Sequence, residues 1–115
     1  MVDDIPNNVG KKGAFTWDET EHPYKVIKEM VKIKQDNPNV ALCLQQIQLD
    51  DSTRLRFCYC NKKKGKWVVA RTAPHMFPEE FQSIVLKAIN EGWIETKSGN
   101  LAGIYLNEVA EEDEG

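Results

Sequence analysis

The stretch from residue 52 to residue 78, STRLRFCYCNKKKGKWVVARTAPHMFP, decides the fold expected for this chain. Apolar residues, many of them aromatic or β-branched, alternate with basic and polar ones on both sides of a lysine-rich turn. This pattern is typical of two antiparallel strands. We expect strands over residues 53–60 and 66–72, joined by a loop over residues 61–65. Gly65 can adopt the positive φ that a five-residue hairpin loop usually needs.

The two faces of this hairpin are expected to carry different chemistry. A symmetric closure pairs Tyr59 with Trp67 on one face. Arg54 and Arg56 then lie on the opposite face, because successive side chains of a strand point to opposite sides. One face must pack on the core, and the sequence leaves open whether the aromatic face is buried or exposed.

Two amphipathic helices are expected outside the hairpin, over residues 23–35 and 78–91, because apolar residues recur there at helical spacing. Pro23 and Pro78 suit the first helical position. A further strand is expected over residues 40–49. The apolar segments 93–95 and 104–106, on either side of residues 97–100, predict a closing hairpin. The predicted fold is α+β, with one mainly antiparallel sheet, two helices and the order α-β-β-β-α-β-β.

The chain is expected to form one domain with polar ends. Residues 1–20 are expected to form a flexible arm, residues 21–107 a single α+β domain, and residues 108–115 an acidic disordered tail. The formal net charge is −3, but the tail alone holds five acids and no base. Once the acids at both ends are set aside, the body of the chain carries an excess of positive charge.

Several classes of function are not supported by the sequence. His22 and His75 stand outside any recognisable triad or metal motif, and the common nucleotide-binding and protease motifs are missing. We therefore expect no enzyme activity, no cofactor and no metal site. The three cysteines are an odd number, and Cys58 lies too close to Cys60 along one strand to favour a disulfide between them. Reduced thiols in a cytoplasmic or nuclear protein are the expected state. No apolar run is long enough to span a membrane, and the N-terminus does not resemble a signal peptide.

The 27-residue stretch is distinctive because it combines seven bases with no acid in a chain where acids outnumber bases. Long cationic side chains suit phosphates, and flat aromatic rings suit unstacked bases. A sheet that presents both can hold a single strand. The sequence therefore predicts a nucleic-acid-binding surface, with single-stranded DNA favoured over RNA. Its candidate residues are Arg54, Arg56, Tyr59, Lys62, Lys63, Lys64, Lys66, Trp67 and Arg71.

The segment from residue 53 to residue 90 resembles the transcriptional positive coactivators and the related Whirly and PUR-type modules. The resemblance rests on RLRFCY from Arg54, the lysine-rich turn, GKWVV from Gly65, and PEEF from Pro78 opening an amphipathic helix. It implies a sheet-then-helix module that binds single-stranded nucleic acid in replication, repair or transcription, and that forms a homodimer. The resemblance implies that Arg54, Arg56, Lys66 and Trp67 contact the nucleic-acid strand.

Two other functions fit the residues. In the first, the chain is a protein-interaction module, a regulator or inhibitor that docks its basic ribbon on an acidic partner. In the second, it is a winged-helix-like binder of duplex DNA with residues 81–89 as recognition helix, although Lys87 is the only base on that helix. The acidic tail could also recruit a protein partner.

Overall fold

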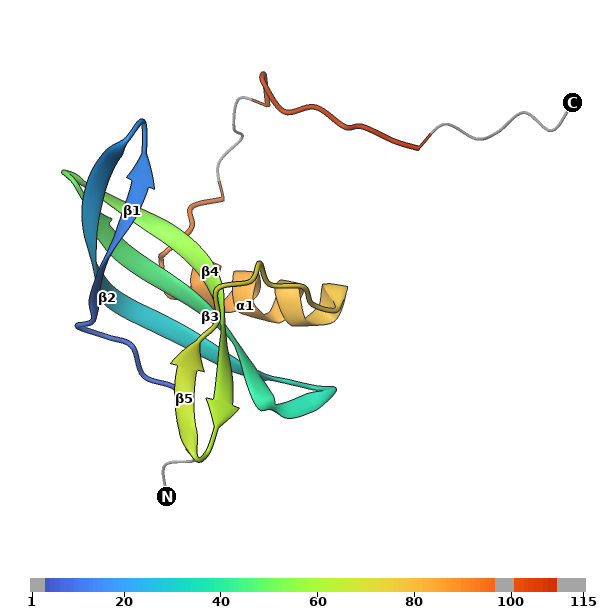
Figure 1. Ribbon diagram of the computed structural model, residues 1–115. Helices are drawn as coiled ribbons and strands as arrows, with labels where there is room; N and C mark the ends of the chain where they lie inside the picture. Colours follow the sequence, from blue (N-terminus) through green and yellow to red (C-terminus); the bar gives the residue numbers. More distant parts are fainter. Residues whose placement is uncertain (1–3, 97–100, 110–115) are drawn as a thin grey trace, which may run out of the picture.

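Within residues 4–96 and 101–109, which the computed structural model describes, five strands form one antiparallel sheet and one helix follows them (Figure 1). The strands lie side by side in sequence order, so each strand pairs with the next through a tight turn. The strands are β1 Lys12–Trp17, β2 Thr20–Lys34, β3 Asn37–Leu49, β4 Ser52–Lys63 and β5 Lys66–Val69, and the helix α1 spans Pro78–Asn90.

The expected order α-β-β-β-α-β-β is wrong, because residues 23–35 belong almost entirely to strand β2 and not to a helix. A β-bulge between Val26 and Lys28 shifts the pairing of β2 with β3 by one residue. Val26 and Val31 therefore share one face of the sheet, although a five-residue separation places side chains on opposite faces of a regular strand. The bulge thus changes the spacing of the apolar residues along β2, and this spacing resembles that of an amphipathic helix.

The hairpin between β4 and β5 is present, but its register differs from the expected one. Lys64 and Gly65 have φ of 51° and 77°, the positive values of a two-residue type I′ turn, whose twist matches the strands. Trp67 consequently pairs with Lys62 instead of Tyr59. The register moves by an odd number of residues, so Trp67 and Tyr59 lie on opposite faces of the sheet.

Other boundaries also differ from the expected ones. The expected flexible arm, residues 1–20, contains strand β1, and β5 ends at Val69 rather than at residue 72. Residues 93–96 and 101–109 contain no strand, and the centre of the expected closing hairpin, residues 97–100, lies outside the described residues. The helix expected over residues 78–91 is confirmed, with Gly92 at φ 78° directly after its C-cap.

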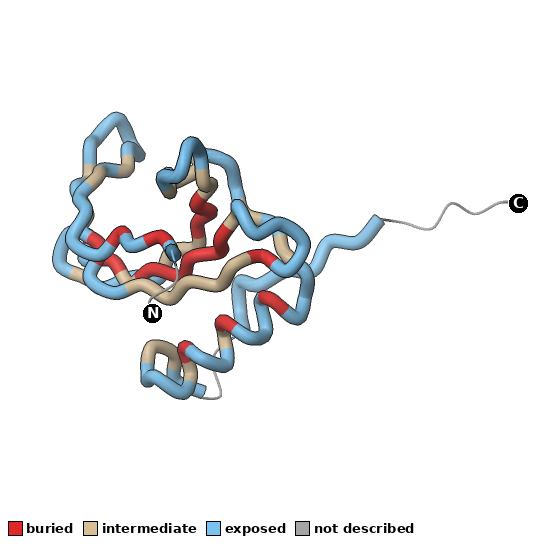
Figure 2. The backbone as a smooth tube through the Cα atoms, turned by 90° about the horizontal axis from the view of Figure 1, so that it is seen from below, coloured by how far each residue is buried: buried red, intermediate tan, exposed pale blue. Residues whose placement is uncertain are grey.

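The sheet curls into a trough, and α1 lies beneath its convex side (Figure 2). On this convex face the helix and the sheet share one core cluster, formed by Leu42, Leu44, Tyr59, Ile84 and Ala88. On the concave face, two further clusters consist of Ala41, Cys43, Cys58 and Cys60, and of Val26, Ile47 and Leu49. Strand β3 is thus covered on both faces along most of its length, as expected for the central strand.

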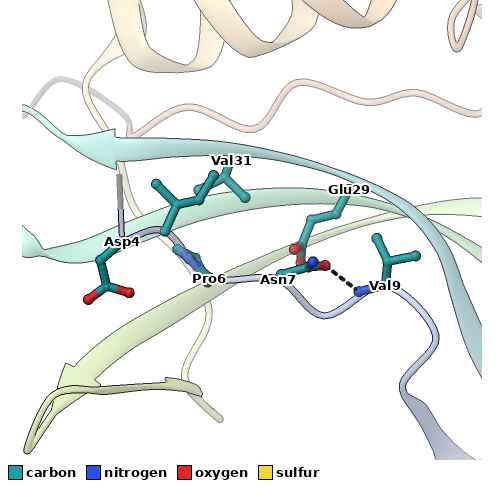
Figure 3. A pocket seen from close by; sticks show the side chains of 7 residues that line it. Asp4, Pro6, Asn7, Val9, Glu29 and Val31 are labelled. Carbon is teal, nitrogen blue, oxygen red and sulfur yellow. Dashed lines mark hydrogen bonds between the residues drawn. The ribbon is translucent and has the colours of Figure 1, made fainter. Parts of the chain in front are cut away.

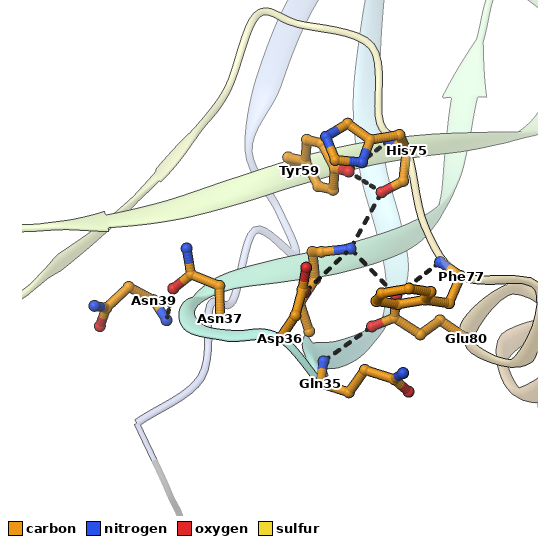
Figure 4. Close-up of polar contacts among 9 residues, drawn as sticks. Gln35, Asp36, Asn37, Asn39, Tyr59, His75, Phe77 and Glu80 are labelled. Atoms are coloured by element: carbon orange, nitrogen blue, oxygen red, sulfur yellow. Dashed lines mark hydrogen bonds and ion pairs between the residues drawn. The ribbon is translucent and has the colours of Figure 1, made fainter.

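A buried ion pair fixes α1 against the end of β2 (Figure 4). Lys34 Nζ lies 3.2 Å from Glu80 Oε1, and the side chains are 5% and 0% exposed. Glu80 also accepts hydrogen bonds from the backbone N–H groups of Phe77 and Gln35. Burial raises the pKa of Glu80, but these hydrogen bonds and Lys34 more than offset it, so the pKa lies below its ordinary value.

The segment from Asp4 to Gly10 crosses the concave face and covers the cysteine cluster. Asn8 donates from its side-chain amide to Glu29 Oε2 at 2.8 Å and to Cys60 Sγ at 3.4 Å. Its backbone N–H donates to Glu29 Oε1 at 3.0 Å. A pocket of about 510 Å³ lies between this segment and β2 (Figure 3). Asn8 therefore anchors the N-terminal segment inside the trough.

Substitution of Asn8 by alanine is expected to lower the free energy of unfolding by about 1–3 kcal/mol, because the partly buried Glu29 carboxylate then loses one of its hydrogen-bond donors. Urea denaturation followed by circular dichroism measures the change. Asn7→Ala is the matched control, since Asn7 is exposed and its side chain accepts a local hydrogen bond from the Val9 N–H, at 3.1 Å. Equal losses for the two variants would show that Asn8 does not anchor the segment.

Candidate nucleic-acid interface

Strand β4 separates the predicted basic residues into two groups at its opposite ends. Arg54 and Arg56 lie near its start, and Lys62 and Lys63 at its end. At 3.3 Å per residue, the nine steps from Arg54 to Lys63 span about 30 Å. The surface predicted as one site is therefore two sites on one strand.

Arg56 lies on the concave face, against two aromatic rings from the first hairpin. Its guanidinium carbon lies 5.3 Å from the ring centre of Phe15 and 5.2 Å from that of Tyr24. The two rings are themselves stacked, with centres 4.6 Å apart. One Arg56 nitrogen donates to the Tyr24 hydroxyl at 2.9 Å, and Gln45 Oε1 lies 3.4 Å from it. These contacts hold the guanidinium in place through cation–π attraction and a hydrogen bond.

A second aromatic stack continues this surface to the end of the hairpin. The rings of Trp17 and His22 have centres 3.4 Å apart and planes within 6° of parallel. His22 also lies 3.3 Å from a carboxylate oxygen of Asp50. Trp17 is 37% exposed, so its indole is open to solvent while it stacks on the imidazole. We call Phe15, Trp17, His22, Tyr24, Arg54 and Arg56 the arginine–aromatic cluster.

Four of these six residues were not among the predicted site residues. Phe15 and Trp17 fall in the expected arm, Tyr24 stands at the start of the expected helix, and His22 directly precedes that helix. A signal was available, because the aromatic rings recur with period two on both sides of Asp18 and Glu19. Those two acids form the turn between β1 and β2, with φ of 52° and 59°. Arg54 and Arg56 supply the positive charge of this cluster, close in sequence to neither of these acids.

The opposite end of β4 carries the lysine hairpin tip, residues 62–66. Lys63, Lys64 and Lys66 are exposed, whereas Lys62 forms an ion pair with Asp4. The hydrogen bond from Lys62 holds the pKa of Asp4 below its ordinary value. Trp67 beside them donates from Nε1 to the Asp4 carbonyl at 3.3 Å. The N-terminal segment thus occupies Lys62 and Trp67 and leaves three lysines of the tip exposed.

The remaining two predicted residues differ sharply in exposure. Tyr59 is buried on the convex face, 6% exposed, and its hydroxyl contacts the backbone of His75 (Figure 4). Its ring packs in the core and offers no face to a base. Arg71 is exposed beyond β5 and borders a recess of about 570 Å³ beside Phe57.

The three cysteines are free thiols in the core. Cys43 Sγ and Cys60 Sγ are 3.6 Å apart, and Cys58 pairs with Cys43 across the strands. Hydrogen bonds from the other two thiols lower the pKa of Cys60. Among the described residues, no group of three or more histidine, cysteine or acidic side chains is arranged to hold a metal ion. The same part of the chain contains no helix that is both long enough and apolar enough to cross a membrane.

Comparisons with models of protein families, with curated proteins and with solved structures find no match for this chain. The resemblance of residues 53–90 to the coactivator, Whirly and PUR-type modules therefore stays a prediction.

Proposed function

We propose that this chain binds single-stranded nucleic acid, and DNA rather than RNA, on the concave face of its sheet. The observation that carries the proposal is the arginine–aromatic cluster, where Arg56 is held against two stacked rings and Trp17 extends the surface outward. Exposed rings can stack on bases, and neighbouring arginines can contact phosphates. The preference for DNA and the role in replication, repair or transcription rest on the resemblance.

The lysine hairpin tip supports the proposal as a second contact region on the same strand. A single strand that stacks on Trp17 could extend toward the tip, where exposed lysines would contact its phosphates. The duplex-binding alternative has less support. Helix α1 buries Ile84 and Ala88 against the sheet, and its one base, Lys87, is paired with Glu91 at 2.9 Å.

A fluorescence-anisotropy titration of the full chain with single-stranded and duplex oligonucleotides, at two salt concentrations, tests the proposal. Three phosphate contacts predict a loss of affinity of about 20-fold between about 50 and 200 mM salt, because bound counterions are released on binding. Tighter binding of the duplex, or an affinity that does not change with salt, would contradict the proposal.

Charge reversal at the tip is expected to separate the two contact regions. Lys63→Glu with Lys64→Glu should reduce the magnitude of the slope of log affinity against log salt concentration by about one per lysine. The double variant should also weaken binding to all oligonucleotide sequences alike. The matched control is Lys12→Glu with Lys25→Glu, which makes the same charge change on paired residues of β1 and β2. If the control changes the slope as much as the tip variant does, the tip makes no specific contact.

A second candidate function is a protein-interaction module that docks on an acidic partner. The ion pair of Lys62 with Asp4 favours it, because it places a carboxylate against the tip. A partner retained after nuclease treatment by the wild type, and lost with Lys63→Glu and Lys64→Glu, would support this function. For either function we propose a cytoplasmic or nuclear location, which the free thiols support.

A further inference from the structure

In the part of the chain that the structure describes, the outer edge of β4 is unpaired over most of its length. Strand β4 contains 12 residues, but β5 pairs only with its last four, Cys60 to Lys63. The next contact is the hydrogen bond from Ala70 N to Tyr59 O, at 2.9 Å. Within the described residues, no strand pairs with the outer edge of β4 before Tyr59.

The direction of the free backbone groups follows from the alternation of an antiparallel ladder. Tyr59 turns its carbonyl toward the outer edge, so Phe57, Leu55 and Thr53 direct their N–H and C=O groups the same way. An open row of this kind is a template for another strand. β1 presents the other outer edge of the sheet, but it has only six residues and begins with a lysine.

Apolar side chains line this edge on the convex face. Leu55 is 42% exposed and Phe81 of α1 is 46% exposed. The rings of Phe57 and Phe81 lie 5.7 Å apart. The recess of about 570 Å³ that is bordered by Phe57 and Arg71 lies at the end of the edge nearest β5. The edge therefore offers backbone hydrogen bonds together with an apolar surface for alternate side chains.

The chain also contains a segment with complementary properties. Residues 101–109 extend away from the sheet (Figure 1). Five of their apolar side chains are 72% to 96% exposed, namely Leu101, Ile104, Tyr105, Leu106 and Val109. The sequence from Leu101 to Gly115 contains no base and five acids, whereas Arg54, Arg56 and Arg71 border the β4 edge.

We propose that a second copy of this chain adds its segment around Ile104–Leu106 to the open edge of β4, and that the exchange is reciprocal and forms a dimer. Added as a strand, Ile104 and Leu106 lie on the side of Leu55 and Phe57. Tyr105 lies on the opposite side, toward Arg54 and Arg56. The positive charge of these arginines favours the approach of the acidic segment of the other copy.

Sedimentation of the full chain, without nucleic acid, tests this proposal between about 1 and 200 µM, a range that brackets a modest dimer affinity. The wild type is expected to double in mass as its concentration rises. Leu55→Pro removes one outward N–H, and proline is tolerated at such positions on edge strands. Ile104→Asp with Leu106→Asp changes exposed residues only. Each variant alone is expected to stay at the mass of one chain.

A one-to-one mixture of the two variants distinguishes exchange between copies from closure on the same chain. The proline variant keeps an intact segment and the aspartate variant keeps an intact edge, so the mixture is expected to regain dimers. Ala14→Pro, on the outer edge of β1, is the matched control and should dimerise like the wild type. Where Leu55→Pro fails to fold by circular dichroism, Leu55→Lys replaces it, since lysine also protects edges.

Three results would overturn the proposal: a wild type of single-chain mass at every concentration, variants that dimerise as the wild type does, or a mixture that does not dimerise. These outcomes do not depend on nucleic-acid binding, so the dimer and the proposed function fail or succeed separately.

Discussion

Replacement of Trp17 by alanine is expected to weaken binding of a single strand by about 5- to 150-fold, the 1–3 kcal/mol that one stacked base contributes. One face of the indole stacks on His22, and the side chain is open to solvent at the outer end of the cluster. The variant removes no charge, so the slope of affinity against salt should stay the same. Fluorescence anisotropy at two salt concentrations measures both quantities.

The chain offers a matched control for this substitution in Trp67. Trp67→Ala removes the same ring from the other end of the concave face, where the indole N–H is bonded to Asp4 and Lys62 lies 5.8 Å from the ring centre. We expect Trp67→Ala to change affinity by about twofold at most, since its ring is already occupied. Equal losses for both tryptophans would move the stacking site to the hairpin tip, and no loss for Trp17→Ala would remove stacking from the proposed function.

Removal of the Glu80 carboxylate is expected to cause the largest loss of stability, about 3–5 kcal/mol, because it leaves a buried ammonium without its partner. Lys34 is 5% exposed at its side chain, and it gains only partial compensation from Asp36 at 3.5 Å. The backbone N–H groups of Phe77 and Gln35 lose their acceptor in the same substitution. Urea denaturation of Glu80→Ala measures the loss.

Two variants separate the effect of burial from that of charge. Glu91→Ala breaks an exposed ion pair with Lys87 on the same helix and is expected to change the stability little, because solvent screens such a pair. Lys34→Met combined with Glu80→Leu removes both buried charges and should recover most of the stability lost in Glu80→Ala. A loss for Glu80→Ala no greater than that for Glu91→Ala would show that the buried pair does not hold the helix.

The same pair contributes to the dependence of stability on pH. The pKa of Glu80 is lowered in the folded chain, so its contribution is complete above the ordinary value of 4.5 and is lost as the pH falls through the lowered pKa. Burial lowers the pKa of Lys34, but Glu80 raises it more, to above 10.5. Its contribution is therefore lost only as the pH rises beyond that value. Glu80→Gln should flatten the acid side of a curve of unfolding free energy against pH.

Local sequence patterns predicted the parts of the fold that depend on local geometry. The strand over residues 40–49, the β4–β5 hairpin and the helix after Pro78 are confirmed, because alternation, a turn glycine and a helix-initiating proline act over a few residues. β2 was predicted as a helix because its bulge at Val26 changes the spacing of its apolar residues. The exact pairing of Trp67 depended on whether the turn has two residues or five, which composition does not determine.

The candidate site was less predictable, because it depends on contacts between distant segments. Arg56 was identified from its charge, but its contact with Phe15 joins residues 41 positions apart, through the pairing of four strands. Tyr59 was predicted as a binding residue because it is aromatic and lies among basic residues. The alternation of side chains along β4, however, places it on the face that the helix covers. Charge and aromatic content indicated the chemistry, whereas the register of the strands determined which side chains share a face.

The strand order has a consequence for the folding pathway. Every strand pairs with its neighbour in sequence, so most of the sheet can form from adjacent hairpins that close short loops, a topology associated with rapid folding. The bonds of Asn8 with Glu29 and of Glu80 with Lys34 join residues 21 and 46 positions apart, and we expect them to form after the rate-limiting step. Substitutions at Asn8 and Glu80 should then accelerate unfolding and leave the refolding rate nearly unchanged, which stopped-flow measurements in urea can separate.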